Sequence, residues 1–179
     1  MGLFDRFKKD KREYDVTDMQ VTDLDRGFVF EYDLKTWQVQ EVYKYDWGDH
    51  FFSYEYKISS GAETRFLSVE DDDELFVVLS QKSNIRKIGE DLPELLADEK
   101  PPKKIEYDNK TFFLEEEAPG YFCNETKSKD NWVELISWTY LNEDEDEVVT
   151  LEQWGEREFE ASLGKVIKPF EISNILPAE

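Results

Sequence analysis

The 179-residue chain contains almost no cysteine or histidine, and this scarcity excludes several kinds of protein. Cys123 is the single cysteine, so the chain forms no internal disulfide and lacks the cysteine pattern of small secreted domains. One cysteine and one histidine, His50, do not make a zinc site. A Ser-His-Asp or Cys-His catalytic arrangement would have to use His50, and no serine lies in a G-x-S-x-G context.

Glycine-rich loops and long apolar runs are missing as well. The eight glycines are scattered singly, so no phosphate-binding loop is present. The acidic stretches 71–74 and 143–147 lack the spaced oxygen ligands of a calcium loop. No run approaches 18 apolar residues, and the N-terminus has no apolar core of signal-peptide length. We therefore expect a cytoplasmic protein and predict no cofactor or metal ion.

Positive charge is scarce in most of the chain. The sequence has 43 acidic and 22 basic residues, which gives a net charge of −21. This is well beyond the magnitude of roughly 2–8 that suits a small soluble domain. Such a field repels nucleic-acid phosphates and anionic lipid, and it attracts basic proteins. A basic protein partner is therefore expected, and nucleic acid is not.

Residues 1–15 form an exception to the acidic composition. Three apolar residues there are spaced for one face of a helix, and five basic residues accompany them. This pattern predicts a segment that docks on a protein partner or makes weak peripheral contact with a membrane. The alternative is a terminus that folds back onto the acidic body. The residues that would make these contacts are Leu3, Phe4, Arg6, Phe7, Lys8, Lys9, Lys11 and Arg12.

A repeated hexapeptide indicates the architecture. Residues 31–36 return as residues 106–111 with five of six positions identical, and both copies predict a tight turn between strands. Two further echoes follow in the same order, since residues 53–56 are matched by 137–140 and residues 67–70 by 149–152. The chain therefore looks like two diverged copies of one β unit.

Alternating apolar and polar residues predict strands throughout the chain. Apolar side chains at odd positions from Trp37 to Trp47 indicate a half-buried strand, and ten to twelve strands are expected in total. Residues 112–114 are expected to form a short strand. Leu92–Ala97 should form a short helix, with Asp91 as N-cap and Pro93 in the first turn.

We therefore expect an all-β fold of two related antiparallel meanders, forming a sandwich or a pair of small barrels, with one short connecting helix. The expected domains are residues 16–83, a connector at 84–104, and residues 105–179.

Several segments together resemble a known bacterial family. These are the strand from Trp37 to Tyr45, Tyr54-Glu55-Tyr56, Leu67-Ser68-Val69-Glu70 and, later, residues 149–156. They are similar to a family known as domain of unknown function 4178, over roughly residues 22–177. The resemblance implies a bacterial accessory protein whose relatives lie in gene neighbourhoods with envelope-stress and small membrane proteins. It implies no catalytic residue.

Three functions remain open at this point. The leading expectation is a non-catalytic interaction or regulatory module that binds a protein partner, at the inner membrane surface or in the cytoplasm. The second is a glycosidase-like hydrolase whose paired carboxylates are Glu70 and Glu152, at the ends of equivalent strands. The third is an acidic mimic of nucleic acid.

Overall fold

The computed structural model describes residues 18–179, and within that range eleven strands form a single antiparallel sheet. The first half contributes β1 (Val29–Tyr32), β2 (Lys35–Asp46), β3 (Phe52–Ser60), β4 (Glu63–Asp72) and β5 (Glu74–Ser83). The second half contributes β6 (Lys104–Tyr107), β7 (Lys110–Asn124), β8 (Trp132–Asn142), β9 (Glu147–Gly155), β10 (Glu158–Ile167) and β11 (Ser173–Leu176). Two α-helices, α1 (Ile85–Ile88) and α2 (Leu92–Ala97), connect the halves, and η2 (Val21–Asp23) and η3 (Pro169–Glu171) are 3₁₀ turns. The predicted all-β class and strand count are confirmed.

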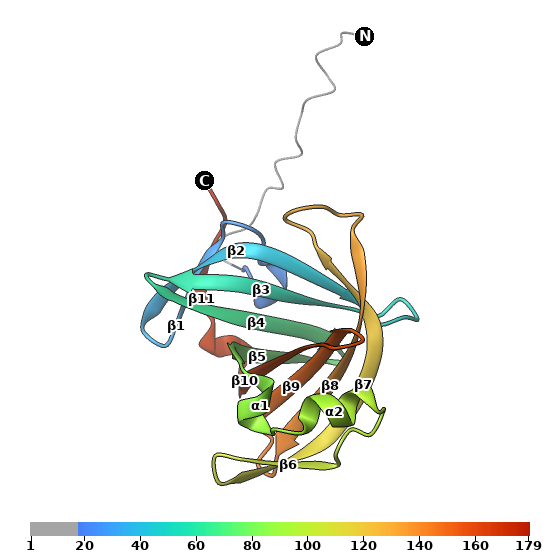
Figure 1. Cartoon of the computed structure of the whole chain (residues 1–179). Helices are drawn as coiled ribbons and strands as arrows, with labels where there is room; N and C mark the ends of the chain where they lie inside the picture. The colour runs from blue at the N-terminus through green and yellow to red at the C-terminus, as the bar shows by residue number, and fades with distance from the viewer. Residues whose placement is uncertain (1–17) are drawn as a thin grey trace.

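The strands close into a ring. Their order is β11-β1-β2-β3-β4-β5-β10-β9-β8-β7-β6, and an additional pairing joins β2 to β7 (Figure 1). The eight strands from β2 to β7 along this order therefore form a closed circuit, which β1, β11 and β6 extend. Within this circuit the halves meet at two seams: residues 77–83 pair with 161–167, and residues 43–46 pair with 121–124. Outside the circuit, β11 of the second half pairs with β1 of the first. The sequence left open a sandwich or a pair of small barrels, whereas the two halves share one continuous sheet.

The two copies of the repeated hexapeptide form equivalent tight turns. Asp33 and Leu34 join β1 to β2 with φ values of 50° and 59°, and Asp108 and Asn109 join β6 to β7 with 51° and 58°. Two central residues with positive φ define the type I′ turn, whose twist matches that of paired strands. The sequence predicted tight turns at both places, and both are present.

Two hydrophobic cores lie on the outer side of the ring. The first core contains Trp37 and Leu67 and is covered by η2, β1 and β11, which contribute Val21, Phe30 and Ile175. The second core is covered by the helices and β6, and its members include Ile88, Leu96, Ile105, Trp138 and Tyr140. Side chains alternate between the two faces of a strand. The residues between these core positions therefore point into the ring.

The connector contains one helix more than predicted. Helix α2 spans Leu92–Ala97 as expected, with Pro93 in its first turn. Asp91 is the N-cap residue as predicted, but its backbone has helical dihedral angles (φ −94°, ψ 0°) and its side chain makes no capping hydrogen bond. Helix α1 was not predicted, because four residues are too few to show a helical period. Its N-cap is Asn84, whose side chain accepts a hydrogen bond from the Arg86 backbone N–H at 2.9 Å.

Strand β7 is much longer than the predicted strand at 112–114. It continues to Asn124 because its last four residues pair with β2. Pro119 is tolerated there since β7 pairs only with β8 at this point, so the missing N–H faces a free edge. A Cβ on Gly120 would lie 2.7 Å from the backbone oxygen of Asp46 and 2.6 Å from the Trp47 ring. Glycine at this position therefore permits the close approach of the two strands.

Within residues 18–179, no helix has the length and apolar character needed to cross a membrane.

Candidate functional site: a polar cavity inside the ring

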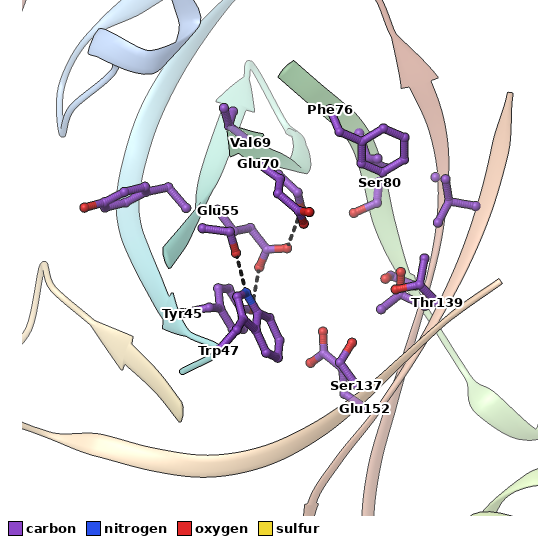
Figure 2. A pocket seen from close by; sticks show the side chains of 18 residues that line it. Tyr45, Trp47, Glu55, Val69, Glu70, Phe76, Ser80, Ser137, Thr139 and Glu152 are labelled. Atoms are coloured by element: carbon purple, nitrogen blue, oxygen red, sulfur yellow. Dashed lines mark hydrogen bonds between the residues drawn. The ribbon is translucent and has the colours of Figure 1, made fainter. Parts of the chain in front are cut away.

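The interior of the ring is polar where the two halves face each other. Along β4, Leu67 and Val69 point to the first core, whereas Ser68 and Glu70 point inward. A cavity of about 110 Å³ lies at this level and is lined by β2, β3, β4 and β5 of one half and by β8, β9 and β10 of the other. Its polar lining includes Glu55, Ser68, Glu70, Ser137, Thr150 and Glu152 (Figure 2).

Glu55 is a buried carboxylate with hydrogen-bond partners. Its side chain in β3 is only 9% exposed, yet both oxygens are occupied. Oε1 accepts a hydrogen bond from the Tyr45 hydroxyl at 3.3 Å, and Oε2 accepts one from the Ser68 hydroxyl at 3.0 Å. Burial, followed by the charge of Glu55, raises the pKa of Tyr45, so this phenol stays protonated and serves as a donor. Figure 2 shows these contacts on one wall of the cavity.

Glu152 is a buried carboxylate without such partners. It lies in β9 with 7% of its surface exposed, and its Oε2 makes no hydrogen bond. Burial raises the pKa of Glu152 to about 7, the charge of Lys82 opposes this, and the carboxylates of Glu55 and Glu160 raise the pKa further. The Trp154 indole lowers it slightly, although its N–H is buried without a conventional hydrogen bond. Glu152 is therefore an unsatisfied acid on a second wall of the cavity.

Lys82 is the cation whose charge lowers the pKa of Glu152. Its ammonium forms an ion pair with Glu160 at 3.2 Å and lies 5.0 Å from the ring centroid of Phe66. The side chain is 42% exposed, so water screens its charge, and it does not line the cavity. The ammonium of Lys82 is thus directed to Glu160 and leaves Glu152 without a direct ion pair.

Glu70 lies in the same cavity and has an apolar cross-strand neighbour. Burial raises the pKa of Glu70, with smaller contributions from Glu116 and Asp72. Its cross-strand neighbour in β5 is Phe76, whereas the corresponding neighbour of Glu152 in β10 is the acid Glu160.

Aromatic rings close the interior next to the β2–β7 seam. Tyr45 stacks on Trp47 with ring centroids 5.4 Å apart and an interplanar angle of 3°. Phe122 of β7 packs against Tyr45 at 5.4 Å and against Trp154 at 5.0 Å, both edge-on. The Trp47 indole also donates a hydrogen bond to Ser53 at 2.8 Å, which fixes its orientation at the cavity wall.

The outer side of the same seam carries exposed aromatic residues. Cross-strand register places Phe52, Asp46, Tyr121 and Glu134 in one row, and the next row on that face runs from Tyr54 through Lys44 and Cys123 to Trp132. Phe52, Tyr121 and Trp132 are 37%, 50% and 38% exposed. The Lys44 ammonium lies 4.4 Å from the Phe52 ring centroid. We call Lys44, Phe52, Tyr121 and Trp132 the seam face.

Sequence comparison supplies the family. The model of a family described as "Domain of unknown function (DUF4178)" matches residues 25–169. The chain belongs to the DUF4178 family. A protein of Aquifex aeolicus (strain VF5), named "Uncharacterized protein", is 28% identical over 191 residues, with 99% of each chain covered. No solved structure matches the chain. The resemblance inferred from the sequence is confirmed, and the DUF4178 match spans every residue that lines the cavity.

The structure brings the two predicted carboxylates of this DUF4178 chain into one cavity. Glu70 and Glu152 both line it, on strands of different halves. However, the carboxylate whose charge raises the pKa of Glu152 most is Glu55. Sequence reasoning missed this residue. Its signal is an acid between two aromatic residues at the centre of a predicted strand. The only histidine, His50, is exposed in the turn between β2 and β3.

The contact residues predicted in the N-terminal segment lie outside the described residues. They are Leu3, Phe4, Arg6, Phe7, Lys8, Lys9, Lys11 and Arg12. From residue 18 onward, no group of three or more His, Cys, Asp or Glu side chains is arranged to hold a metal ion, and this includes the acidic turns.

Proposed function

We propose that this chain is a non-catalytic interaction module that binds a basic protein partner through the seam face. Three large aromatic side chains lie partly exposed in two adjacent rows of one sheet face, and this observation carries the proposal. Exposed tryptophan and tyrosine are the residues that most often dominate binding energy at protein interfaces.

The charge around the seam face defines the partner's chemistry. Asp46 and Glu134 lie in the same row as Phe52 and Tyr121, and the whole chain carries a net charge of −21. A partner with arginine or lysine beside apolar side chains complements this surface, and long-range attraction speeds its approach. The Lys44 ammonium makes a cation–π contact with Phe52 inside this face.

The basic N-terminal segment suits a role in localisation. Its charges and apolar side chains would bring the acidic module to the inner membrane surface, where the partner would also lie. The module would otherwise be cytoplasmic. Replacing Lys8 and Lys9 by glutamate in the full chain is expected to release the protein from the membrane fraction of its native host. Unchanged membrane association would contradict this role.

Photo-crosslinking tests the seam face directly. A photoreactive phenylalanine at Tyr121 in the native host is expected to capture one basic protein, and the adduct is expected to disappear when Trp132→Ala is added. The same probe at Phe170, which is exposed in η3 away from the seam, is the control. An identical adduct from Phe170, an adduct that survives Trp132→Ala, or no adduct at all would each contradict the proposal.

The buried carboxylates support a second candidate, a hydrolase. Glu152, with a pKa near 7, and the hydrogen-bonded Glu55 face each other across one cavity and could serve as the acid and base of a glycosidase. The cavity of about 110 Å³ is small, however, compared with the roughly 300–1,000 Å³ of pockets for larger ligands. Hydrolysis of aryl glycosides that is lost in Glu152→Gln would favour the hydrolase over the non-catalytic module.

The acidic charge also leaves the nucleic-acid mimic as an alternative. A mimic would bind basic nucleic-acid-binding proteins with an affinity that falls steeply with salt. It would not depend on Trp132, because the charges that it uses are spread over the whole surface. The Trp132→Ala variant therefore separates this alternative from the seam-face proposal.

We also propose that the two meanders are copies of one β unit, and cross-strand register supports this. Tyr56 pairs with Leu67 in the first half, and the matched residues Tyr140 and Val149 pair in the second. Extending the match to β5 and β10 makes Ser80 equivalent to Gly164, and these two residues pair with each other. A pseudo-twofold axis through that pair would relate Glu70 to Glu152 across the shared cavity.

A further inference from the structure

The cavity contains a carboxylate oxygen without a partner. Glu152 is more than nine-tenths buried and lines the cavity, and its Oε2 makes no hydrogen bond. A buried polar atom without a partner costs free energy, and a buried carboxylate costs more than a neutral group. Glu55 on the facing wall shows how the fold satisfies such a group, because two hydroxyls donate to it. Glu152 therefore retains hydrogen-bond capacity for a donor that residues 18–179 do not provide.

The charges around this oxygen favour a positively charged donor. The charges of Glu55 in β3 and Glu160 in β10 raise the pKa of Glu152, and the charge of Lys82 in β5 lowers it. The Lys82 ammonium is already paired with Glu160. None of the residues that line the cavity is a lysine, arginine or histidine. Among the residues that the structure describes, the cavity therefore has acidic side chains in its lining and no basic one.

The rest of the lining suits an organic ion better than a metal ion. Ser137 and Thr150, which carry hydroxyl groups, and the stacked aromatic side chains of Tyr45 and Trp47 also line the cavity. Hydroxyl oxygens accept N–H donors, and aromatic faces attract cations. Across residues 18–179, no group of three or more ligating side chains is arranged for a metal ion. The volume of about 110 Å³ has room for only a few non-hydrogen atoms.

We propose that this cavity binds a small organic ammonium ion, whose N–H groups donate to the free oxygen of Glu152 while Glu55 supplies further negative charge. The aromatic side chains of Tyr45 and Trp47 contact its apolar part. Binding in the cavity does not depend on the seam face, which lies on the opposite side of the sheet. An experiment can therefore contradict either proposal without contradicting the other.

Calorimetry of the full chain with butylammonium at pH 8 tests the proposal. Saturable binding is expected, with at least tenfold weaker binding of butanol, which has a similar shape and no charge. Glu152→Gln is expected to weaken butylammonium binding at least tenfold, because an amide keeps the shape of the side chain and loses its charge. Glu143→Gln, which removes the same charge from an exposed turn, is expected to leave the affinity unchanged.

The pH dependence of binding and the NMR signals of the carboxyl groups provide two further tests. Because the pKa of Glu152 lies near 7 in the free protein, affinity for butylammonium is expected to rise about tenfold from pH 6 to pH 8. Carboxyl carbon signals of Glu55 and Glu152 are expected to shift on binding. Absence of saturable binding, equal affinity for butanol, equal affinity of Glu152→Gln and the native chain, or a flat pH dependence would each overturn it.

Discussion

Glu152 in β9 and Glu70 in β4 line the same cavity from different halves, but their cross-strand neighbours differ in charge. Across the strand pair, Glu152 faces the acid Glu160, whereas Glu70 faces Phe76. The repeat proposed above makes Thr139 the counterpart of Glu55, so only Glu152 has a buried carboxylate on the facing strand. Under the proposed repeat, a few inward-pointing residues that differ between the halves make the site asymmetric.

Removal of the Glu152 charge gives the largest expected effect and tests this asymmetry. The folded-state pKa of about 7 lies above the ordinary value, so the folded protein is stabilised below about pH 4.5 and loses that stability as the pH rises through 7. Glu152→Gln is therefore expected to raise the free energy of unfolding at pH 8 by about 3 kcal/mol and to leave it unchanged at pH 4.

The matched variant is Glu70→Gln. The pKa of Glu70 is also raised, but less, so the same substitution is expected to give a smaller gain at pH 8. Urea unfolding at both pH values measures the two effects. Equal gains for the two variants, or a gain for Glu152→Gln that does not depend on pH, would remove the contrast between the halves.

The next largest effect concerns the seam that makes the cavity common to both halves. Gly120→Ala is expected to lower the free energy of unfolding by about 2 kcal/mol, because a Cβ would overlap the backbone oxygen of Asp46. Gly155→Ala is the control, since its Cβ would meet atoms no closer than 3.7 Å. Urea unfolding of both variants provides the measurement. A similar small change in both would mean that the β2–β7 closure contributes little.

A smaller effect is expected when one half is made more like the other. Glu55→Thr replaces the first-half carboxylate by the residue type of its counterpart Thr139. Like-charge repulsion of Glu152 then falls, so the stability gain of Glu152→Gln at pH 8 is expected to shrink by about 1 kcal/mol in the Glu55→Thr background. A double-mutant cycle by urea unfolding measures this coupling. Additive effects of the two substitutions would show that the carboxylates do not interact.

The smallest effect is expected at the two matched turns. Leu34 is fully exposed with a φ of 59°, a conformation that asparagine adopts more readily than leucine. Leu34→Asn is expected to stabilise the protein by about 0.5 kcal/mol, and Asn109→Leu to destabilise it by about as much. Thermal unfolding checks both. Changes of the same sign in the two variants would mean that the turns are not equivalent.

The elements that the sequence predicted are those with local signals. The turns at Asp33 and Asp108, the alternation along β2 and the helix at Leu92–Ala97 all depend on residues close together in the chain. The β2–β7 pairing joins residues about 80 positions apart, and no local pattern marks it. For this reason the length of β7 and the seam face were missed.

The candidate site was predictable only in part for the same reason. Glu70 and Glu152 were found because they end matched segments, and they do share a cavity. Glu55 was missed because its burial depends on ring closure, which turns an apparently solvent-facing position of β3 inward. The free oxygen of Glu152 could not be read from sequence, since it depends on which hydroxyls reach which carboxylate.

The most direct test of the asymmetric cavity is a carboxyl carbon NMR titration of the full chain, with Glu70 as the internal comparison. Glu152 is expected to titrate with a pKa near 7 in the free protein, above that of Glu70. Butylammonium is expected to lower the pKa of Glu152 and to leave that of Glu70 nearly unchanged. An ordinary pKa for Glu152, or the same response of both carboxyls to the ligand, would contradict the account.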